Sequence, residues 1–187
     1  MPRNTTILLI RHAEKPASGP KLSAGGEARA QAYSVFFQGY PVDGAPVRPR
    51  FLFAAADSDA SHRPRLTVEP LASALRLEIN DKHADKDYAE VARHLLDHPK
   101  YDDATVLVCW HHGEILQLAQ ALGADAGVLP PAAGWPPHWP GEVFGWVLQL
   151  RYDGAGRLVP GQTRCTSQRL MYDDCGQEPP LTGAPTA

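Results

Sequence analysis

Residues 7–16 read Ile-Leu-Leu-Ile-Arg-His-Ala-Glu-Lys-Pro, an apolar run that turns abruptly polar. Four aliphatic residues lead directly into Arg11 and His12, and Pro16 closes the segment. An unbroken apolar run bounded by turn residues is typical of a strand buried on both faces of a parallel sheet. In open α/β sheets, ligands bind at the carboxyl ends of such strands, where these polar residues begin. The segment therefore predicts a parallel sheet with chemistry at Arg11 and His12.

Two further apolar strands are expected, and each also ends in polar residues. Residues 51–56 are followed by Arg63, and residues 104–110 are followed by His111. Helices are predicted after a Ser23 N-cap and over residues 67–77, 88–96 and 115–122. Pro70 would then lie in the first turn of its helix, where proline is tolerated. Alternating strands and helices predict a three-layer α/β/α sandwich on a largely parallel central sheet.

The C-terminal third is expected to be less regular. Residues 130–140 carry five prolines and two tryptophans, which predicts a surface loop or a lid near the site. Trp135 and Trp139 either pack this loop on the sheet or line the mouth of a pocket and select an apolar leaving group. Residues 143–152 and 156–163 are predicted to form a hairpin.

Length and composition are those of a single domain. The 187 residues are 43% hydrophobic, enough for one core, which we place over residues 1–176. Residues 177–187 are rich in Pro, Gly and Thr and predict a disordered tail. The net charge of −3 gives no reason to expect nucleic acid or an anionic membrane as a partner.

Location in the cell is predicted from the same composition. No apolar run approaches the roughly 18 residues of a membrane-spanning helix, and the N-terminus lacks a signal-peptide pattern, so a cytoplasmic protein is expected. The three cysteines have no metal-binding spacing. Cys109 lies in an apolar strand pattern and is expected to be inert, and Cys165 and Cys175 would pair only in an exported protein.

The three strand ends bring a distinctive set of side chains to one edge of the predicted sheet. Arg11 and His12 come from the first strand, Arg63 follows the second, and His111 follows the third. Planar guanidiniums match phosphate oxygens bidentately, and an imidazole can act as a nucleophile. The set therefore predicts a dianion site suited to phosphoryl transfer, in which positioning and charge stabilisation dominate.

Four segments also occur in the order of a known family. They are Leu9–Pro16 (Leu-Ile-Arg-His-Ala-Glu-Lys-Pro), Leu22–Ala30, Arg63–Ala72 and Val106–His111. They resemble the histidine phosphatase superfamily, with its phosphoglycerate-mutase-like fold, and Ala13 stands where the family has glycine. The resemblance covers roughly residues 6–150.

The resemblance implies a metal-independent phosphatase that uses no cofactor. His12 would attack phosphorus to give a phosphohistidine, and Arg11, Arg63 and His111 would hold the phosphoryl oxygens. The second ring nitrogen of His12 would donate to a backbone carbonyl, and His111 would preferably be charged. The substrate would be a phosphorylated small molecule or a phosphoprotein, and the oligomeric state is left open.

No motif fixes the general acid. The family takes it from the segment after the second arginine's helix, which implies Asp81, Asp85 or Asp87, and we choose Asp85. The alternative reading of these residues is a solvated acidic loop. Glu14 is a rival acid, although the resemblance suggests that it supports the pocket wall.

Further residues are expected near the site, and two of them, Lys15 and Ser58, have two possible roles each. Lys15 either adds positive charge at the rim or faces solvent. Ser58 either donates a hydrogen bond to phosphate or caps a turn. His111 and His112 are adjacent at a strand end and point to opposite sides, and the register against Gly113 assigns His111 to the site.

Two other classes of function remain open. A catalytically weak phospho-ligand-binding module would keep the pocket without an efficient acid, and turnover separates it from an enzyme. A metal hydrolase would use His12, His111 and His112 and would lose activity to a chelator. The sequence has no His-Glu-x-x-His motif to support the metal hydrolase.

Overall fold

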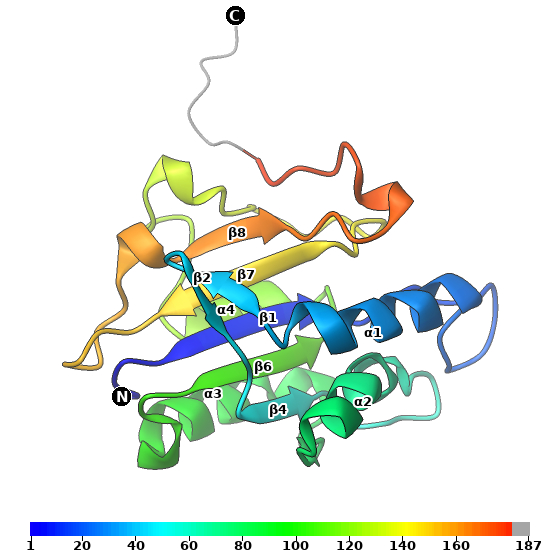
Figure 1. Cartoon of the computed structure of the whole chain (residues 1–187), viewed down its shortest axis with the longest axis horizontal. Coiled ribbons are helices and arrows are strands. Elements are labelled where there is room, and N and C mark those ends of the chain that lie inside the picture. Colours follow the sequence, from blue (N-terminus) through cyan, green and yellow to red (C-terminus); the bar gives the residue numbers. More distant parts are fainter. Residues whose placement is uncertain (181–187) are drawn as a thin grey trace, which may run out of the picture.

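The computed structural model describes residues 1–180 and has a six-stranded mixed sheet at its centre (Figure 1). The strand order is β5-β4-β6-β1-β7-β8. The strands are β1 (Thr6–Arg11), β4 (Phe51–Ala54), β5 (Ile79–Asn80), β6 (Thr105–Trp110), β7 (Trp146–Arg151) and β8 (Arg164–Ser167). A separate two-stranded sheet is made of β2 (Tyr40–Val42) and β3 (Ala45–Val47). The helices are α1 (Ala24–Phe36), α2 (Arg63–Leu75), α3 (Tyr88–Asp97) and α4 (Ile115–Ala121).

Parallel pairing brings the carboxyl ends of three strands to one edge of the sheet. β1 pairs in parallel with β6, with Arg11 opposite Trp110. β4 pairs in parallel with the other side of β6, with Ala54 opposite Cys109. The residues that follow these strands therefore lie near one another. β7 runs antiparallel to β1, and β8 in turn pairs antiparallel with β7.

Helices cover both faces of the sheet, and β1 is therefore buried on both sides. Leu8 and Ile10 pack with side chains of α1 and α2, whereas Ile7 and Leu9 pack with side chains of α3 and α4. All six residues of β1 are buried. The predicted three-layer α/β/α sandwich is confirmed (Figure 1).

Helix α2 begins earlier than the sequence pattern indicated. The predicted start at residue 67 is wrong, because the helix begins at Arg63, with Pro64 in its first turn. Proline is favoured there since its missing N–H is one that a helix start leaves unpaired. Pro70 consequently lies inside the helix and not in its first turn. The Ser23 N-cap of α1 is confirmed, since its hydroxyl accepts from the N–H of Gly26 at 3.1 Å.

The predicted C-terminal hairpin is only partly correct. β7 pairs with β8, and not with residues 156–163, which add a single bridge from Tyr152 to Leu158. Pro160 begins a 3-10 turn in that stretch, and proline cannot donate to a strand ladder. The second strand therefore forms only after this turn.

The cysteines and the end of the chain are simply described. Cys109 and Cys165 are buried, Cys175 is exposed, and all three are free, so Cys165 and Cys175 do not pair. Trp146 Nε1 donates to the carbonyl of Gln177 at 2.6 Å, at the start of the expected disordered tail. Residues 181–187 of that tail lie outside the described residues. Among residues 1–180, no helix has the length and apolarity needed to cross a membrane.

Candidate active site

His12 is held at the end of β1 with one ring nitrogen free. Its backbone N–H donates to the carbonyl of Trp110 at 3.0 Å, continuing the ladder with β6. Its Nδ1 lies 2.7 Å from the carbonyl oxygen of Ala13. Because a carbonyl only accepts, the neutral ring carries its proton on Nδ1 and its lone pair on Nε2. His12 is only 3% exposed, so its ring and the lone pair of Nε2 are held in a fixed orientation.

The pKa of His12 is lowered by its burial and by the positive charges around it. Burial, followed by the charges of Arg11, His111 and Arg63, lowers the pKa of His12 to about 3. The structure therefore brings together the four residues that the sequence assigned to phosphoryl binding and attack. At neutral pH His12 is unprotonated, as attack on phosphorus requires.

His111 follows β6 and faces His12 edge-on. The two ring centroids lie 5.0 Å apart at an interplanar angle of 69°. Burial and the charges of Arg63, His112 and Arg11 lower the pKa of His111 to about 4. The expectation that His111 is charged while His12 is neutral is therefore wrong for the free protein, because both rings share the same buried, cationic surroundings.

Arg11 is buried beneath the segment that precedes β7. Its guanidinium carbon lies 3.9 Å from the ring centroid of Phe144, and its Nη2 lies 3.3 Å from Nδ1 of His112. Its Nη1 donates to three carbonyl oxygens, those of Pro140 at 3.3 Å, Gly141 at 2.8 Å and Val143 at 2.9 Å. Its Nε has no partner among the described residues.

Arg63, like Arg11, donates to backbone carbonyls and keeps a buried Nε. Its Nη1 donates to the carbonyl of Gly19 at 3.1 Å, and its Nη2 donates to that of Ala60 at 3.3 Å. Its Nε is buried and, within residues 1–180, makes no hydrogen bond. A buried donor without a partner is costly in free energy. Both arginines therefore keep one N–H donor that an anionic oxygen would satisfy.

Thr67 is a member of the site that the sequence analysis missed. Its hydroxyl accepts from the N–H of Ala13 at 2.9 Å and donates to the carbonyl of Arg63 at 2.7 Å. It therefore joins the nucleophile's loop to the helix that carries Arg63. Residues four apart share a helix face, so its spacing from Arg63 was the available signal.

Asp85 lies beside His111 in a short 3-10 helix, Asp85–Asp87. Its backbone carbonyl accepts from Nε1 of Trp110 at 2.9 Å, and its Oδ1 is buried without a partner among the described residues. Burial and the nearby charge of Glu114 raise the pKa of Asp85 to about 6, while the N–H of His111 opposes the rise. The carboxyl is therefore no part of a solvated acidic loop, and it holds a proton at mildly acidic pH.

The three residues expected to bind substrate have mixed positions. Glu14 turns its carboxylate toward Arg29, with Nη2 of Arg29 at 2.7 Å from Oε1. Lys15 is exposed, and together with burial and Arg11 its charge lowers the pKa of His112. The Ser58 hydroxyl accepts from a backbone N–H three residues on at 3.2 Å, which is the turn-capping arrangement.

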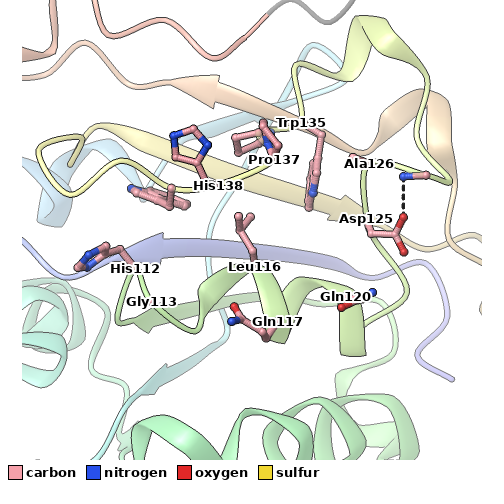
Figure 2. A pocket seen from close by; sticks show the side chains of 13 residues that line it. His112, Gly113, Leu116, Gln117, Gln120, Asp125, Ala126, Trp135, Pro137 and His138 are labelled. Atoms are coloured by element: carbon pink, nitrogen blue, oxygen red, sulfur yellow. Dashed lines mark hydrogen bonds between the residues drawn. The ribbon is translucent and has the colours of Figure 1, made fainter.

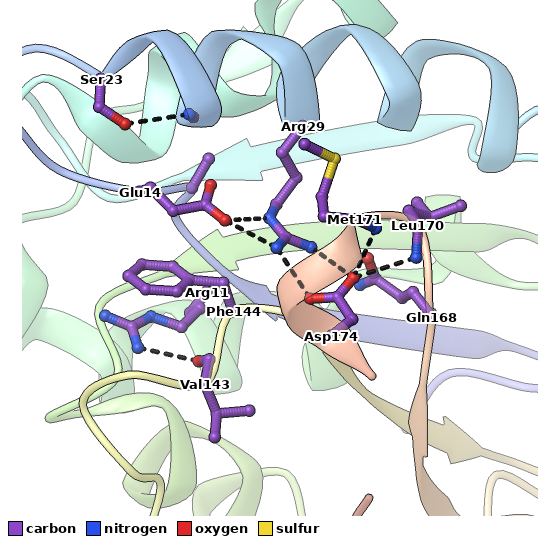
Figure 3. A network of polar contacts seen from close by, with 12 residues as sticks. Arg11, Glu14, Ser23, Arg29, Val143, Phe144, Gln168, Leu170, Met171 and Asp174 are labelled. Carbon is purple, nitrogen blue, oxygen red and sulfur yellow. Dashed lines mark hydrogen bonds and ion pairs between the residues drawn. The ribbon is translucent and has the colours of Figure 1, made fainter. Parts of the chain in front are cut away.

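The sequence analysis also missed a buried ion-pair network centred on Arg29 (Figure 3). Arg29 of α1 lies between Glu14 and Asp174, and Asp174 comes from a 3-10 helix near the end of the described chain. The side chains of Arg29 and Asp174 are each 1% exposed. The residues that flank Asp174 show no periodic pattern, so this pairing with Arg29 could not be predicted from sequence.

One cavity lies against the Pro-rich segment, and His12 is not among its lining residues. It measures about 670 Å³ and runs along α4 from His112 to Asp125, with the Pro-rich segment as its other wall (Figure 2). Trp135 and Trp139 line it but are only 4% and 6% exposed. Both tryptophans therefore chiefly pack the segment onto the sheet. The buried arginine Nε donors that lack a partner within residues 1–180 belong to Arg11 and Arg63, and neither arginine lines this cavity.

No group of three or more His, Cys, Asp or Glu side chains in residues 1–180 is arranged to hold a metal ion. His12 and His111 face each other, but His112 turns to Arg11. The three histidines named for a metal hydrolase are therefore not arranged as a ligand set.

Comparison with known proteins gives matches at the level of structure. Neither the family models nor the curated protein sequences contain a match to this chain. The protein histidine phosphatase SixA, solved in complex with tungstate, superposes with a TM-score of 0.57 at 16% identity, covering 87% of this chain and 97% of that one. A SixA protein from Agrobacterium tumefaciens superposes with a TM-score of 0.54 at 17% identity, covering 83% of this chain and 96% of that one.

These two structures match the chain over nearly their whole length. The match therefore includes the central sheet and the helices that cover it. The fold expected from the four sequence segments is therefore confirmed. The chain has the fold of these two SixA structures.

Proposed function

We propose that this protein is a metal-independent phosphatase that acts through a phosphohistidine at His12. One arrangement carries the proposal: Nε2 of His12 is unprotonated, because Nδ1 is bonded to Ala13, and it lies among two arginines whose Nε–H donors have no partner in the described chain. A tetrahedral oxyanion would satisfy both donors with its phosphorus in front of Nε2. The SixA structure solved with tungstate shows that a protein of this fold takes such an anion.

The first chemical step forms the N–P bond. Nε2 of His12 attacks phosphorus as the bond from phosphorus to the leaving-group oxygen breaks, and Asp85 gives its proton to that oxygen. Arg11, Arg63 and His111 stabilise the charge on the three equatorial oxygens. A bound dianion also offsets the two guanidinium charges, which favours a protonated His111 in the complex.

The second step releases phosphate. Water attacks phosphorus, the N–P bond breaks, and the Asp85 carboxylate takes the proton from that water. His12 returns to its neutral form with the proton still on Nδ1, because Ala13 holds that nitrogen throughout. The nucleophile is thus regenerated without a change of tautomer.

We expect Asp85→Asn to slow hydrolysis of phenyl phosphate by about 10²- to 10⁴-fold, since a general acid contributes that much. The loss should be much smaller with p-nitrophenyl phosphate, whose leaving group needs little protonation. Asp85 loses its proton as pH rises through about 6. The ratio of the native rate to the Asp85→Asn rate should therefore fall above that pH. The ratio removes the ionisation of the substrate itself.

The measurement is kcat/KM for both esters from pH 4 to 9, in the native protein and in Asp85→Asn. Asp87→Asn is the matched control, since Asp87 lies in the same 3-10 helix but its carboxylate caps the N–H of Ala84 at 3.0 Å. Equal losses with both esters would remove Asp85 from the role of acid.

The proposed function itself is tested by hydrolysis of p-nitrophenyl phosphate and phospho-amino acids with excess chelator. We expect turnover that survives the chelator and is inhibited by tungstate. Loss of turnover with the chelator would favour a metal hydrolase. Tungstate binding without turnover of any probe would favour a phospho-ligand-binding module.

We also propose a cytoplasmic location. The exposed Cys175 and the buried Cys165 are both free, and unpaired thiols persist in a reducing compartment. Fractionation of cells that express the tagged protein tests the location.

A further inference from the structure

The orientation of His12 depends on a single peptide group, the one that joins Ala13 to Glu14. Its carbonyl oxygen lies 2.7 Å from Nδ1 of His12 and sets both the tautomer and the tilt of the ring. The preceding peptide group, between His12 and Ala13, is fixed as well, because its N–H donates to the hydroxyl of Thr67 at 2.9 Å. Rotation of the Ala13–Glu14 peptide would free Nδ1 and allow the proton to move to Nε2, which would remove the nucleophile.

Glu14 holds the far end of this peptide by its backbone and by its side chain. Its carbonyl accepts from the N–H of Ser23 at 2.9 Å, and the backbone of Gly26 lies so close that a side chain there would collide with the Glu14 carbonyl. Its Oε1 accepts from both Nε and Nη2 of Arg29, at 2.8 and 2.7 Å. Arg29 therefore holds the side chain of Glu14, while Ser23 and Gly26 hold its backbone.

Arg29 is in turn fixed by Asp174 (Figure 3). Nη1 and Nη2 of Arg29 donate to Oδ2 and Oδ1 of Asp174 at 3.0 and 2.8 Å, a bidentate pair. The N–H groups of Leu170 and Met171 each donate to Oδ2 at 3.0 Å. Asp174 is thus anchored to its own segment. Hydrogen bonds run from it through Arg29 to Glu14, whose peptide bond to Ala13 carries the carbonyl that contacts His12.

The Asp174 carboxylate fits because residue 145, next to Phe144, is a glycine without a side chain. A Cβ on Gly145 would come within 2.5 Å of Oδ1 of Asp174. Phe144, the neighbour of Gly145, packs under the Arg11 guanidinium and has its ring centroid 6.4 Å from that of His12. The carboxylate of Asp174 therefore lies against the segment of Gly145 and Phe144, and it is linked to Glu14 through Arg29.

One carboxylate would be enough to neutralise Arg29, and burying a second is not in itself a strong source of stability. The second carboxylate fixes the direction of the guanidinium, which a single partner bonded through one oxygen does not. We propose that Asp174 is a positioning residue for His12, which it keeps in the Nδ1–H tautomer through Arg29 and Glu14. This role rests on the proposed function for its effect on rate, but its effect on the tautomer does not.

Asp174→Asn tests the proposal, because an amide NH₂ facing the donors of Arg29 breaks the bidentate pair without changing side-chain size. Gly145→Ala is a second route, since it displaces the carboxylate and keeps every charge. Asp43→Asn is the matched control: Asp43 pairs with Arg164 at 3.1 Å on the surface. Imidazole ¹⁵N spectra at neutral pH report the tautomer of His12, and p-nitrophenyl phosphate reports turnover.

We expect Asp174→Asn and Gly145→Ala to raise the Nε2–H fraction of His12 several-fold and to lower kcat by about 10- to 100-fold, with KM changed less than about twofold. Asp43→Asn should change neither. A purely structural role would lower the melting temperature but leave the tautomer and kcat of the folded protein unchanged, and that result would overturn the proposal. If native protein hydrolyses no phosphorylated probe, the proposed function fails, and the tautomer alone still decides the role of Asp174.

Discussion

His12→Ala should abolish phosphatase turnover, with a loss on the order of 10⁴- to 10⁶-fold in kcat, as for other covalent nucleophiles. His12 is the residue that presents an unprotonated nitrogen among the two orphaned guanidinium donors. Arg11 and Arg63 remain in the variant, so tungstate should still bind. Initial rates with p-nitrophenyl phosphate in excess chelator, together with tungstate titration by calorimetry, measure both effects.

The covalent intermediate gives this prediction a second arm. Native protein quenched in alkali during turnover should carry a phosphohistidine signal in ³¹P spectra, and His12→Ala should not. His98→Ala is the control, because this exposed histidine follows α3 away from the site and should retain native rates. Residual turnover in His12→Ala within about tenfold of native would show that another group performs the attack.

The part of this site that was predictable came from patterns that are local in sequence. The apolar run of β1 and that of β6 both end in their predicted polar residues, and parallel pairing sets Arg11 opposite Trp110, one residue before His111. Strand ends meet at one edge of a parallel sheet for geometric reasons. Four separate sequence positions could therefore be placed together without knowing a single contact.

The contacts that tune the site were not predictable, because they join distant segments through irregular backbone. Nη1 of Arg11 is held by carbonyls about 130 positions away, and a carbonyl leaves no trace in the choice of side chain. Asp174 is equally remote from Arg29, in a segment without periodicity. The error over His111 has a similar origin, because its pKa depends on burial that the sequence does not reveal.

Arg29→Met should destabilise the protein by about 3–5 kcal/mol, the typical result of removing one partner from a buried ion pair. Asp174 is 1% exposed, and the variant leaves its carboxylate without the guanidinium. In the native protein, hydrogen bonds from Arg29 and from backbone N–H groups outweigh burial and lower the pKa of Asp174. Its contribution to stability is therefore present above the unfolded pKa and is lost as pH falls through the lowered folded value.

Removing Arg29 should raise the pKa of Asp174, because burial then acts without the guanidinium and favours the protonated acid. The deficit of Arg29→Met should consequently be largest near pH 7 and should shrink as pH falls and Asp174 takes up a proton. Urea unfolding at pH 7 and pH 4.5 measures both values. Arg164→Met, which breaks the exposed pair with Asp43, should lose no more than about 1 kcal/mol.

Double replacement separates the cost of an unpaired charge from that of lost packing. Arg29→Met combined with Asp174→Leu removes both buried charges and replaces them with apolar groups, which is often close to neutral. The double variant should therefore regain most of the stability lost by Arg29→Met while remaining impaired in turnover. Failure to regain stability would mean that the guanidinium stabilises the fold through its contact with Glu14, and that Asp174 is a minor partner in the pair.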